Sequence, residues 1–252
     1  MFNLFDYPAL LFALALPTFW GLAHVGAFFR ARRLEQQSVL HEDLAFILGA
    51  ALTLLGLIIG FTFSMAVSRY DQRKNLEEEE ANAIGTEYLR ASLLPAGDAT
   101  RVRALLRDYT EQRLLKYTTH DESQLKQIAS ETARLQNEMW VAVTKPVAEQ
   151  PALIALVIAG MNDVLNSQGY TQAAWWNRIP TAAWVLVLAI CVLCNVLVGY
   201  VVRGRSGLQF MILPIALAIC LSLIADIDSP RRGLIHVRPQ NLESLARGLH
   251  SQ

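Results

Sequence analysis

Charged residues are scarce in this chain of 252 residues. Asp, Glu, Lys and Arg make up 17% of it, whereas soluble domains of ordinary composition carry about a quarter. Hydrophobic residues make up 53%, and the formal net charge is +0. A neutral chain gives no electrostatic reason to expect nucleic acid as a partner. The scarcity is uneven, because charge is absent from four long runs and is concentrated between them.

Cysteine is also rare. The three cysteines, Cys191, Cys194 and Cys220, all lie inside apolar runs, and none lies in the polar region. The chain therefore has no disulfide framework. Cys191 and Cys194 have the spacing of a metal-binding or redox pair, but no further Cys or His lies near them. We interpret them as packing residues.

The motifs of the common enzyme classes are missing. The sequence contains no Gly-x-Ser-x-Gly, no His-Glu-x-x-His and no phosphate-binding glycine loop. The acidic run Glu77–Glu80 points in four successive helical directions, so it does not form one paired-carboxylate site. We expect neither an enzyme nor a bound cofactor or metal.

Four long runs without a charged residue are the main feature that is present. A bilayer core needs about 20 apolar residues of helix, and each run has that length. Four soluble core helices that are apolar on all sides would be improbable. We therefore predict a multi-pass membrane protein with four spans: Pro8–Phe29, Leu44–Ser68, Ile179–Val202 and Ser206–Ala225.

About a hundred residues of different character separate the second span from the third. Apolar residues at helical spacing, interrupted by prolines, predict a helix that continues the second span and three that follow it. Asp98 or Thr100 is the expected cap of the second of these helices. No segment alternates as a strand does, so the predicted fold class is an all-α membrane protein. The predicted helices of this insertion cover about 71–94, 98–118, 122–143 and 151–165. The whole chain is predicted to divide into four parts: transmembrane helices 1 and 2 (1–70), a helical domain (71–178), transmembrane helices 3 and 4 (179–226) and a tail (227–252).

Basic residues give two readings of the orientation. The short linkers carry five of them, at Arg30, Arg32, Arg33, Arg203 and Arg205. The opposite side carries seven: Arg69, Arg73, Lys74, Arg178, Arg231, Arg232 and Arg238. The positive-inside rule is most reliable for short loops, so charge alone leaves both orientations open.

A resemblance to a known family begins at the end of the second span. Gly60-Phe61 followed by Arg69-Tyr70-Asp71 resembles the corresponding part of the bestrophin channels. The block from Glu80 to Arg90, with Leu94-Pro95 after it, is similar to the bacterial bestrophin-like family, which is known mainly as a domain of unassigned function. Unlike eukaryotic bestrophins, the chain lacks an acidic cluster long enough for a calcium clasp.

The resemblance implies a homo-oligomer, a pentamer, with one central pore lined by the second span. It also implies a location in the bacterial inner membrane, with both termini and the helical domain in the cytoplasm. The expected partners are therefore the lipid bilayer, further copies of the chain and permeant inorganic ions.

Position relative to Gly60-Phe61 matches Thr53, Leu57 and Phe61 to the apolar neck of the bestrophin pore. Such a ring can gate by dewetting; alternatively, these residues face lipid or a neighbouring helix. Ser64 and Ser68 are further candidates for lining the pore, or they bond their own backbone. The predicted basic pore mouth consists of Arg69 and Arg73, with ordinary pairing on a solvated helix as the alternative.

An oligomeric ion channel is the leading functional hypothesis. The alternative is a non-conducting membrane scaffold whose helical domain binds a partner protein, motivated by the acidic segment Glu77–Glu87. Two polar groups inside the spans, His24 and Asn195, are secondary candidates. The pair Asp226 and Asp228 suggests calcium by its oxygen ligands, but helix capping is the preferred reading because further ligands are missing.

Overall fold

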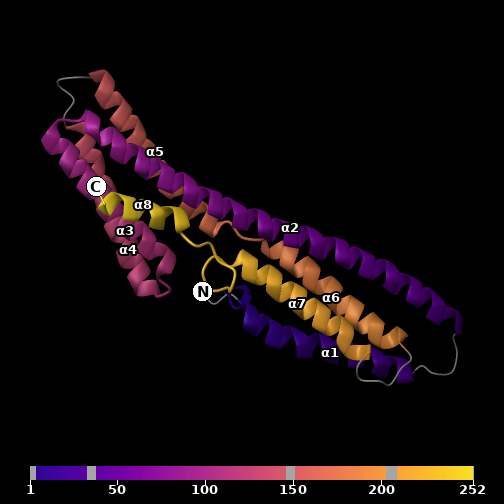
Figure 1. Cartoon of the computed structure of the whole chain (residues 1–252). Coiled ribbons are helices and arrows are strands. Elements are labelled where there is room, and N and C mark those ends of the chain that lie inside the picture. Colours follow the sequence, from indigo (N-terminus) through magenta and orange to yellow (C-terminus); the bar gives the residue numbers. More distant parts are fainter. Residues whose placement is uncertain (1–3, 33–37, 146–150, 203–208, 252) are drawn as a thin grey trace. The chain divides into compact units, whose positions relative to one another are not determined.

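The computed structural model describes residues 4–32, 38–145, 151–202 and 209–251 (Figure 1). These residues form helices and no strand, which confirms the predicted fold class. Arg33, Arg203 and Arg205 of the basic linkers lie outside the described residues. The short 3-10 helices are η1 (Leu4–Asp6) and η2 (Ala91–Leu93), and the α-helices are α1 (Pro8–Arg32), α2 (Ser38–Arg90), α3 (Ala96–Thr118), α4 (Glu122–Thr144), α5 (Pro151–Trp176), α6 (Thr181–Val201), α7 (Gln209–Asp228) and α8 (Gln240–His250).

The chain divides into two compact units. The first unit consists of Met1–Arg69 and Arg178–His236, and the second of Tyr70–Asn177 and Val237–Gln252. Residues 227–252, which the sequence assigned to one tail, are thus shared between the units. The long helix α2 contributes its apolar part to the first unit and its charged part to the second.

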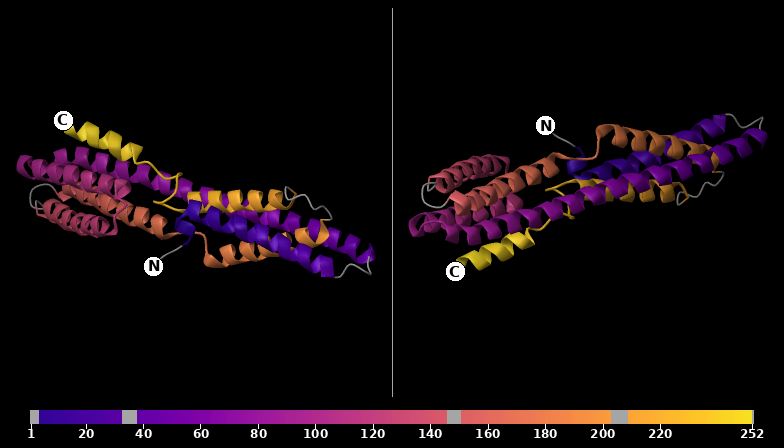
Figure 2. Two further views of the ribbon diagram at one scale, coloured as in Figure 1. Left: turned by 90° about the horizontal axis from the view of Figure 1, so that it is seen from below. Right: turned by 90° about the horizontal axis from the view of Figure 1, so that it is seen from above.

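The first unit is a bundle of apolar helices in which α1 packs against α6 and α7 (Figure 2). Two glycines allow the close approach of α1 and α6. A Cβ at Gly199 would overlap the carbonyl oxygen of Ala23, and a Cβ at Gly26 would overlap that of Val196. Small residues are common where membrane helices cross closely. Neither position can therefore carry a larger side chain without moving the backbone of the facing helix.

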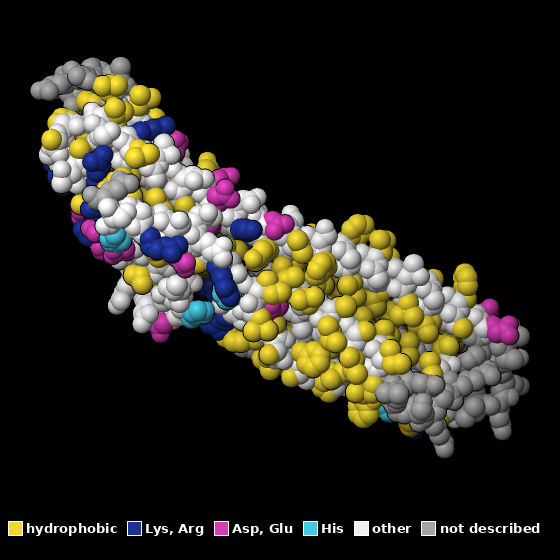
Figure 3. Space-filling view, in the orientation of Figure 1, with side chains coloured by type: hydrophobic (Ala, Val, Ile, Leu, Met, Phe, Trp, Pro, Cys, Tyr) yellow, Lys and Arg dark blue, Asp and Glu magenta, His cyan; other side chains and the backbone are white. Residues whose placement is uncertain are grey.

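The surface of the first unit is apolar, which fits a lipid environment. The described residues contain four helical segments long and apolar enough to cross a membrane: Pro8–Arg32, Glu42–Leu93, Leu153–Val201 and Phe210–Asp228. Hydrophobic side chains cover this unit in the space-filling view, whereas charged side chains gather over the second unit (Figure 3). In water this apolar surface would be costly. These features are those of a membrane protein with helical spans.

The second unit packs the charged part of α2 with α3, α4, α5 and α8 around one core. Ile84, Tyr88 and Ala91 follow each other at intervals of four and three residues, which is the spacing that places side chains on one face of a helix. From the other helices the fully buried core residues are Val102, Leu106 and Tyr109 of α3, Met139 and Val143 of α4, Val157, Met161 and Val164 of α5, and Leu242 of α8.

Local sequence signals explain where α3 and α4 begin. Asp121 caps α4, because its side chain accepts from the backbone N–H groups of Ser123 and Gln124. The N-cap of α3 is Pro95 rather than Asp98 or Thr100, so that prediction was wrong. Proline is well suited to the start of a helix, because the N–H that it lacks would have no partner inside the helix.

Candidate functional site

The five residues predicted to line a pore share one exposed stripe of α2. Thr53, Leu57, Phe61, Ser64 and Ser68 are all exposed in the single chain, with Leu57 at 55% and Phe61 at 64%. Their spacing of three and four residues keeps them on one face of the helix. We call these five residues the α2 stripe. It makes no burying contact within the chain, so it is available to lipid, to water or to a second copy.

The opposite face of α2 packs into the first unit. Leu48, Leu55, Thr62 and Ala66 are buried there, and they too recur at intervals of seven and four residues. The hydroxyl of Thr62 donates to the carbonyl of Ile58 at 2.7 Å. This arrangement fixes the rotation of α2, and so it decides which side chains the α2 stripe exposes.

Hydroxyls on α2 first satisfy their own helix. Thr53, a member of the α2 stripe, donates to the carbonyl of Gly49 at 3.0 Å. Its oxygen keeps acceptor capacity for water or a cation, and its methyl group adds to the apolar surface. The stripe is therefore mainly apolar around Leu57 and Phe61 and more polar toward Ser64 and Ser68.

The two arginines of the predicted basic mouth differ in exposure. Arg69 is half-buried, whereas Arg73 is 1% exposed and lies on the buried face of α2. Because Arg73 has almost no accessible surface in the single chain, an ion outside the helix could not contact it directly. Its charge could act on such an ion only through the electric field. Arg69 is the arginine of the pair that lies partly at the surface.

Two members of the acidic run that follows, Glu77 and Glu80, are buried in the second unit. Glu77 is 1% exposed and accepts from the backbone N–H of Leu242 at 2.9 Å and from the side-chain amide of Asn241 at 2.7 Å. Leu242 lies in the first turn of α8, where free N–H groups favour a carboxylate. Glu77 therefore caps α8 through a residue that lies 165 positions away in the chain.

Glu80 forms a buried ion pair with Arg113 of α3. Both are at most 1% exposed, and Nη2 of Arg113 donates to Oε2 of Glu80 at 3.1 Å. The hydroxyl of Thr171 on α5 donates to the same carboxylate at 3.2 Å. Burial, followed by the negative charge of Glu80, raises the pKa of Tyr109 and Tyr117. These phenols therefore stay protonated, and the cluster joins α2, α3 and α5.

The two aspartates at the end of α7 hold backbone groups. Asp226 accepts from the N–H groups of Leu234 at 2.6 Å and Ile235 at 2.9 Å. Asp228 accepts from the N–H of Ile179 at 3.1 Å and pairs with Arg178 at 3.3 Å. Over the described ranges no cluster of three or more His, Cys, Asp or Glu has the geometry of a metal site. These carboxylates shape the turn after α7 and the approach to α6.

The polar groups inside the spans also bond locally. His24 Nδ1 lies 2.9 Å from the carbonyl oxygen of Trp20, and its ring packs against Trp20 and Phe210. Asn195 is fully buried and donates to the carbonyl of Cys191 at 2.8 Å. Both candidates therefore have a partner in their own helix.

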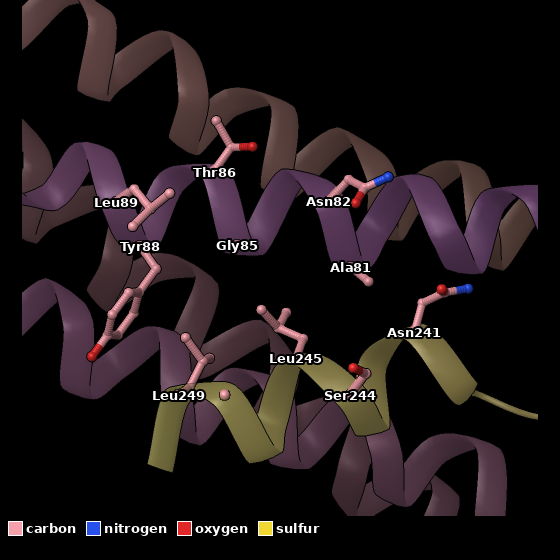
Figure 4. A pocket seen from close by; sticks show the side chains of 11 residues that line it. Ala81, Asn82, Gly85, Thr86, Tyr88, Leu89, Asn241, Ser244, Leu245 and Leu249 are labelled. Carbon is pink, nitrogen blue, oxygen red and sulfur yellow. The ribbon is translucent and has the colours of Figure 1, made fainter. Parts of the chain in front are cut away.

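A groove of about 460 Å³ lies between α2 and α8 in the second unit. Figure 4 shows Tyr88 and Leu89 of α2 on one side, and Leu245 and Leu249 of α8 on the other. Gly85 faces Leu245 so closely that an added Cβ would lie 3.1 Å from its Cδ1. The groove is open and of mixed polarity, and all the residues that line it belong to the second unit.

Sequence reasoning missed the residues that organise the second unit. Arg113 and Thr171 carry no local motif, and their role depends on Glu80, which lies 33 and 91 residues away. The only available signal was the regular spacing of Glu77, Glu80 and Glu87, which places them on one face of a helix together with Ile84. Acidic residues on the face that also carries buried apolar residues indicate internal partners.

Comparison with known proteins identifies the architecture. The protein-family model of the Bestrophin-like domain matches residues 12–242. A crystal structure of a bacterial bestrophin homolog from Klebsiella pneumoniae is similar, with 14% identity, 96% of each chain covered and a TM-score of 0.67. A variant of that homolog gives 13% identity, 94% and 97% coverage and a TM-score of 0.69. A crystal structure of a variant of a membrane protein is similar as well. The identity is 12%, 95% of this chain and 97% of that chain are covered, and the TM-score is 0.70. No curated protein matches the chain.

Proposed function

The chain belongs to the bestrophin-like family, and on this premise we propose that it forms an oligomeric ion channel whose pore is lined by α2. The proposal includes a homo-oligomer, a pentamer, in the bacterial inner membrane, with both termini and the second unit in the cytoplasm. Inorganic ions are the permeant species. The observation that carries the proposal is the α2 stripe, an exposed face of a spanning helix that the single chain leaves uncovered.

The chemistry of the α2 stripe suits a narrow apolar constriction. In a ring of copies, Leu57 and Phe61 would form successive apolar layers, and such layers gate by excluding water. Ser64 and Ser68 would follow with hydroxyls that can replace part of an ion's hydration. Arg69 would add positive charge at the mouth, with Arg73 acting through its field from within the protein.

The size of the side chain at position 61 should control the flux. In liposomes that contain the purified protein, Phe61→Ala is expected to raise ion flux several-fold, because a methyl group leaves a wider and more easily hydrated ring. The measurement is efflux of a trapped anion or cation, each tested separately.

The matched control is Phe63→Ala. Phe63 is exposed at 39% on the same helix, but it lies off the α2 stripe. Its flux is expected to equal that of the wild type. Absence of flux for all common inorganic anions and cations, in vesicles shown to contain assembled protein, would contradict the proposal.

The scaffold alternative loses the observation that motivated it. It relied on an acidic helix presented to a partner, but Glu77, Glu80 and Glu87 are at most 1% exposed. Of the glutamates in that segment, only Glu78 and Glu79 lie at the surface. The buried glutamates have partners or enclosures inside the second unit, so we do not put a scaffold forward as the function.

A further inference from the structure

The carboxyl group of Glu87 is enclosed at the contact of α2 with α5 in the second unit. Its side chain is 0% exposed, and among the residues that the structure describes neither oxygen has a hydrogen-bond partner. Glu77 and Glu80 on the same face both have donors, so Glu87 is the exception. An ionised carboxylate without donors in such a place is strongly disfavoured, whereas the neutral acid is tolerated.

Gly160 of α5 provides the space that the carboxyl group occupies. A Cβ at this position would overlap Oε2 of Glu87 and Nη1 of Arg90. Val157, Met161 and Val164, which flank Gly160 along α5, are all fully buried. The carboxyl group therefore sits, with the side chain of Arg90, at a gap in the buried face of α5 that only glycine leaves open.

The charged groups around Glu87 come from three helices. Arg90 belongs to α2, and Asp163 lies on the exposed side of α5. From α3, Arg103 and Arg107 bond the backbone and the hydroxyl of Tyr88. Farther along the same face, Glu80 is neutralised by Arg113. Burial raises the pKa of Glu87 to about 8; Arg90 opposes this rise and Asp163 adds to it.

We propose that Glu87 and Gly160 form a proton-operated latch between α2 and α5. In the closed state the neutral acid lies over Gly160. When α5 separates from α2, water reaches the carboxyl group and it loses its proton to solvent. Proton concentration thereby sets how firmly α5 is held, which is a property of the second unit that does not depend on conduction.

The direction of the pH effect follows from linkage. The pKa of Glu87 is about 8 in the closed state, against an ordinary value of 4.5 for a glutamate in water. Between these values the closed state holds a proton that the open state has lost, so the latch weakens as pH rises. The latch is strongest at pH values below 4.5, and it weakens no further at pH values above about 8.

Hydrogen–deuterium exchange of the full-length protein in detergent tests the latch. After division by intrinsic exchange rates, opening of the α5 peptide around residues 154–165 is expected to rise by up to about 100-fold from pH 6 to pH 8, the single-proton limit of tenfold per unit. Glu87→Gln should make this opening independent of pH. Glu79→Gln, at an exposed position of the same helix, should leave the wild-type pH dependence intact.

A second variant tests the same idea without touching the buried group. Asp163 is exposed, so Asp163→Asn is compatible with folding, and loss of its negative charge should move the levelling-off of the exchange profile to lower pH. The latch is refuted if opening of α5 shows no pH dependence in the wild type. It is also refuted if the dependence persists unchanged in Glu87→Gln, or if Asp163→Asn leaves the profile in place.

Discussion

Arg113→Met is expected to destabilise the second unit by about 3–5 kcal/mol, because it leaves a buried charge without its partner. Glu80 is 0% exposed and receives its charged hydrogen bonds from Arg113. Methionine preserves much of the volume, so the effect isolates the lost pairing. The free energy of unfolding of the full-length protein in detergent, from denaturant titration, measures it.

Arg134→Met is the matched control. Arg134 pairs with Glu131 and Glu138 on the surface of α4, where its side chain is 53% exposed. Exposed pairs contribute little because water screens them, so this variant should unfold at nearly the wild-type midpoint. Adding Glu80→Gln to Arg113→Met should recover part of the loss. If both arginine variants behave alike, the ion pair does not hold α2 to α3.

Gly199→Leu is expected to disrupt the first unit. The Cβ alone would overlap the Ala23 carbonyl oxygen, which belongs to the backbone of α1 and cannot rotate away. Overpacking usually costs about 1–3 kcal/mol and occasionally more; a backbone obstacle favours the upper end. The expected result is a marked fall in the yield of folded protein and in the thermal midpoint of what remains.

Gly21→Leu provides the comparison. Gly21 lies on α1, and an added Cβ there would meet nothing within 4 Å. It makes the same chemical change on a spanning helix without the crossing contact, and its yield should match the wild type. Equal tolerance of leucine at positions 21 and 199 would show that the close crossing of α1 and α6 is not required.

The number of spans and the helical insertion follow from length and charge, which are local properties of the sequence. The helix around 71–94 and its stop near Pro95 were equally readable. The extension of α5 to Trp176 was missed, because Asn162 and Asp163 were taken as an interruption, whereas both are exposed and leave the buried face intact. The short helix α8 was also missed, since only Leu242 and Leu249 of its residues are buried.

The roles of the acidic residues could not be read from sequence. The sequence placed Glu77–Glu80 in four successive helical directions but did not show which members turn inward; these are Glu80, which meets Arg113, and Glu77, which meets the first turn of α8. Those partners lie tens to more than a hundred residues away. The spacing of the α2 stripe could be read from the sequence, because helical spacing is a local property. In the structure the buried face of α2 lies opposite the stripe.

Thiol accessibility on α2 tests the pore most directly. In protein whose Cys191, Cys194 and Cys220 are replaced by alanine and which still conducts, Phe61→Cys is compared with Phe63→Cys. The two positions lie close in depth but about 160° apart around the helix. A charged, water-soluble thiol reagent is predicted to stop flux through Phe61→Cys and to leave Phe63→Cys unaffected. Block at position 63 alone, or at neither position, would contradict a pore lined by the α2 stripe.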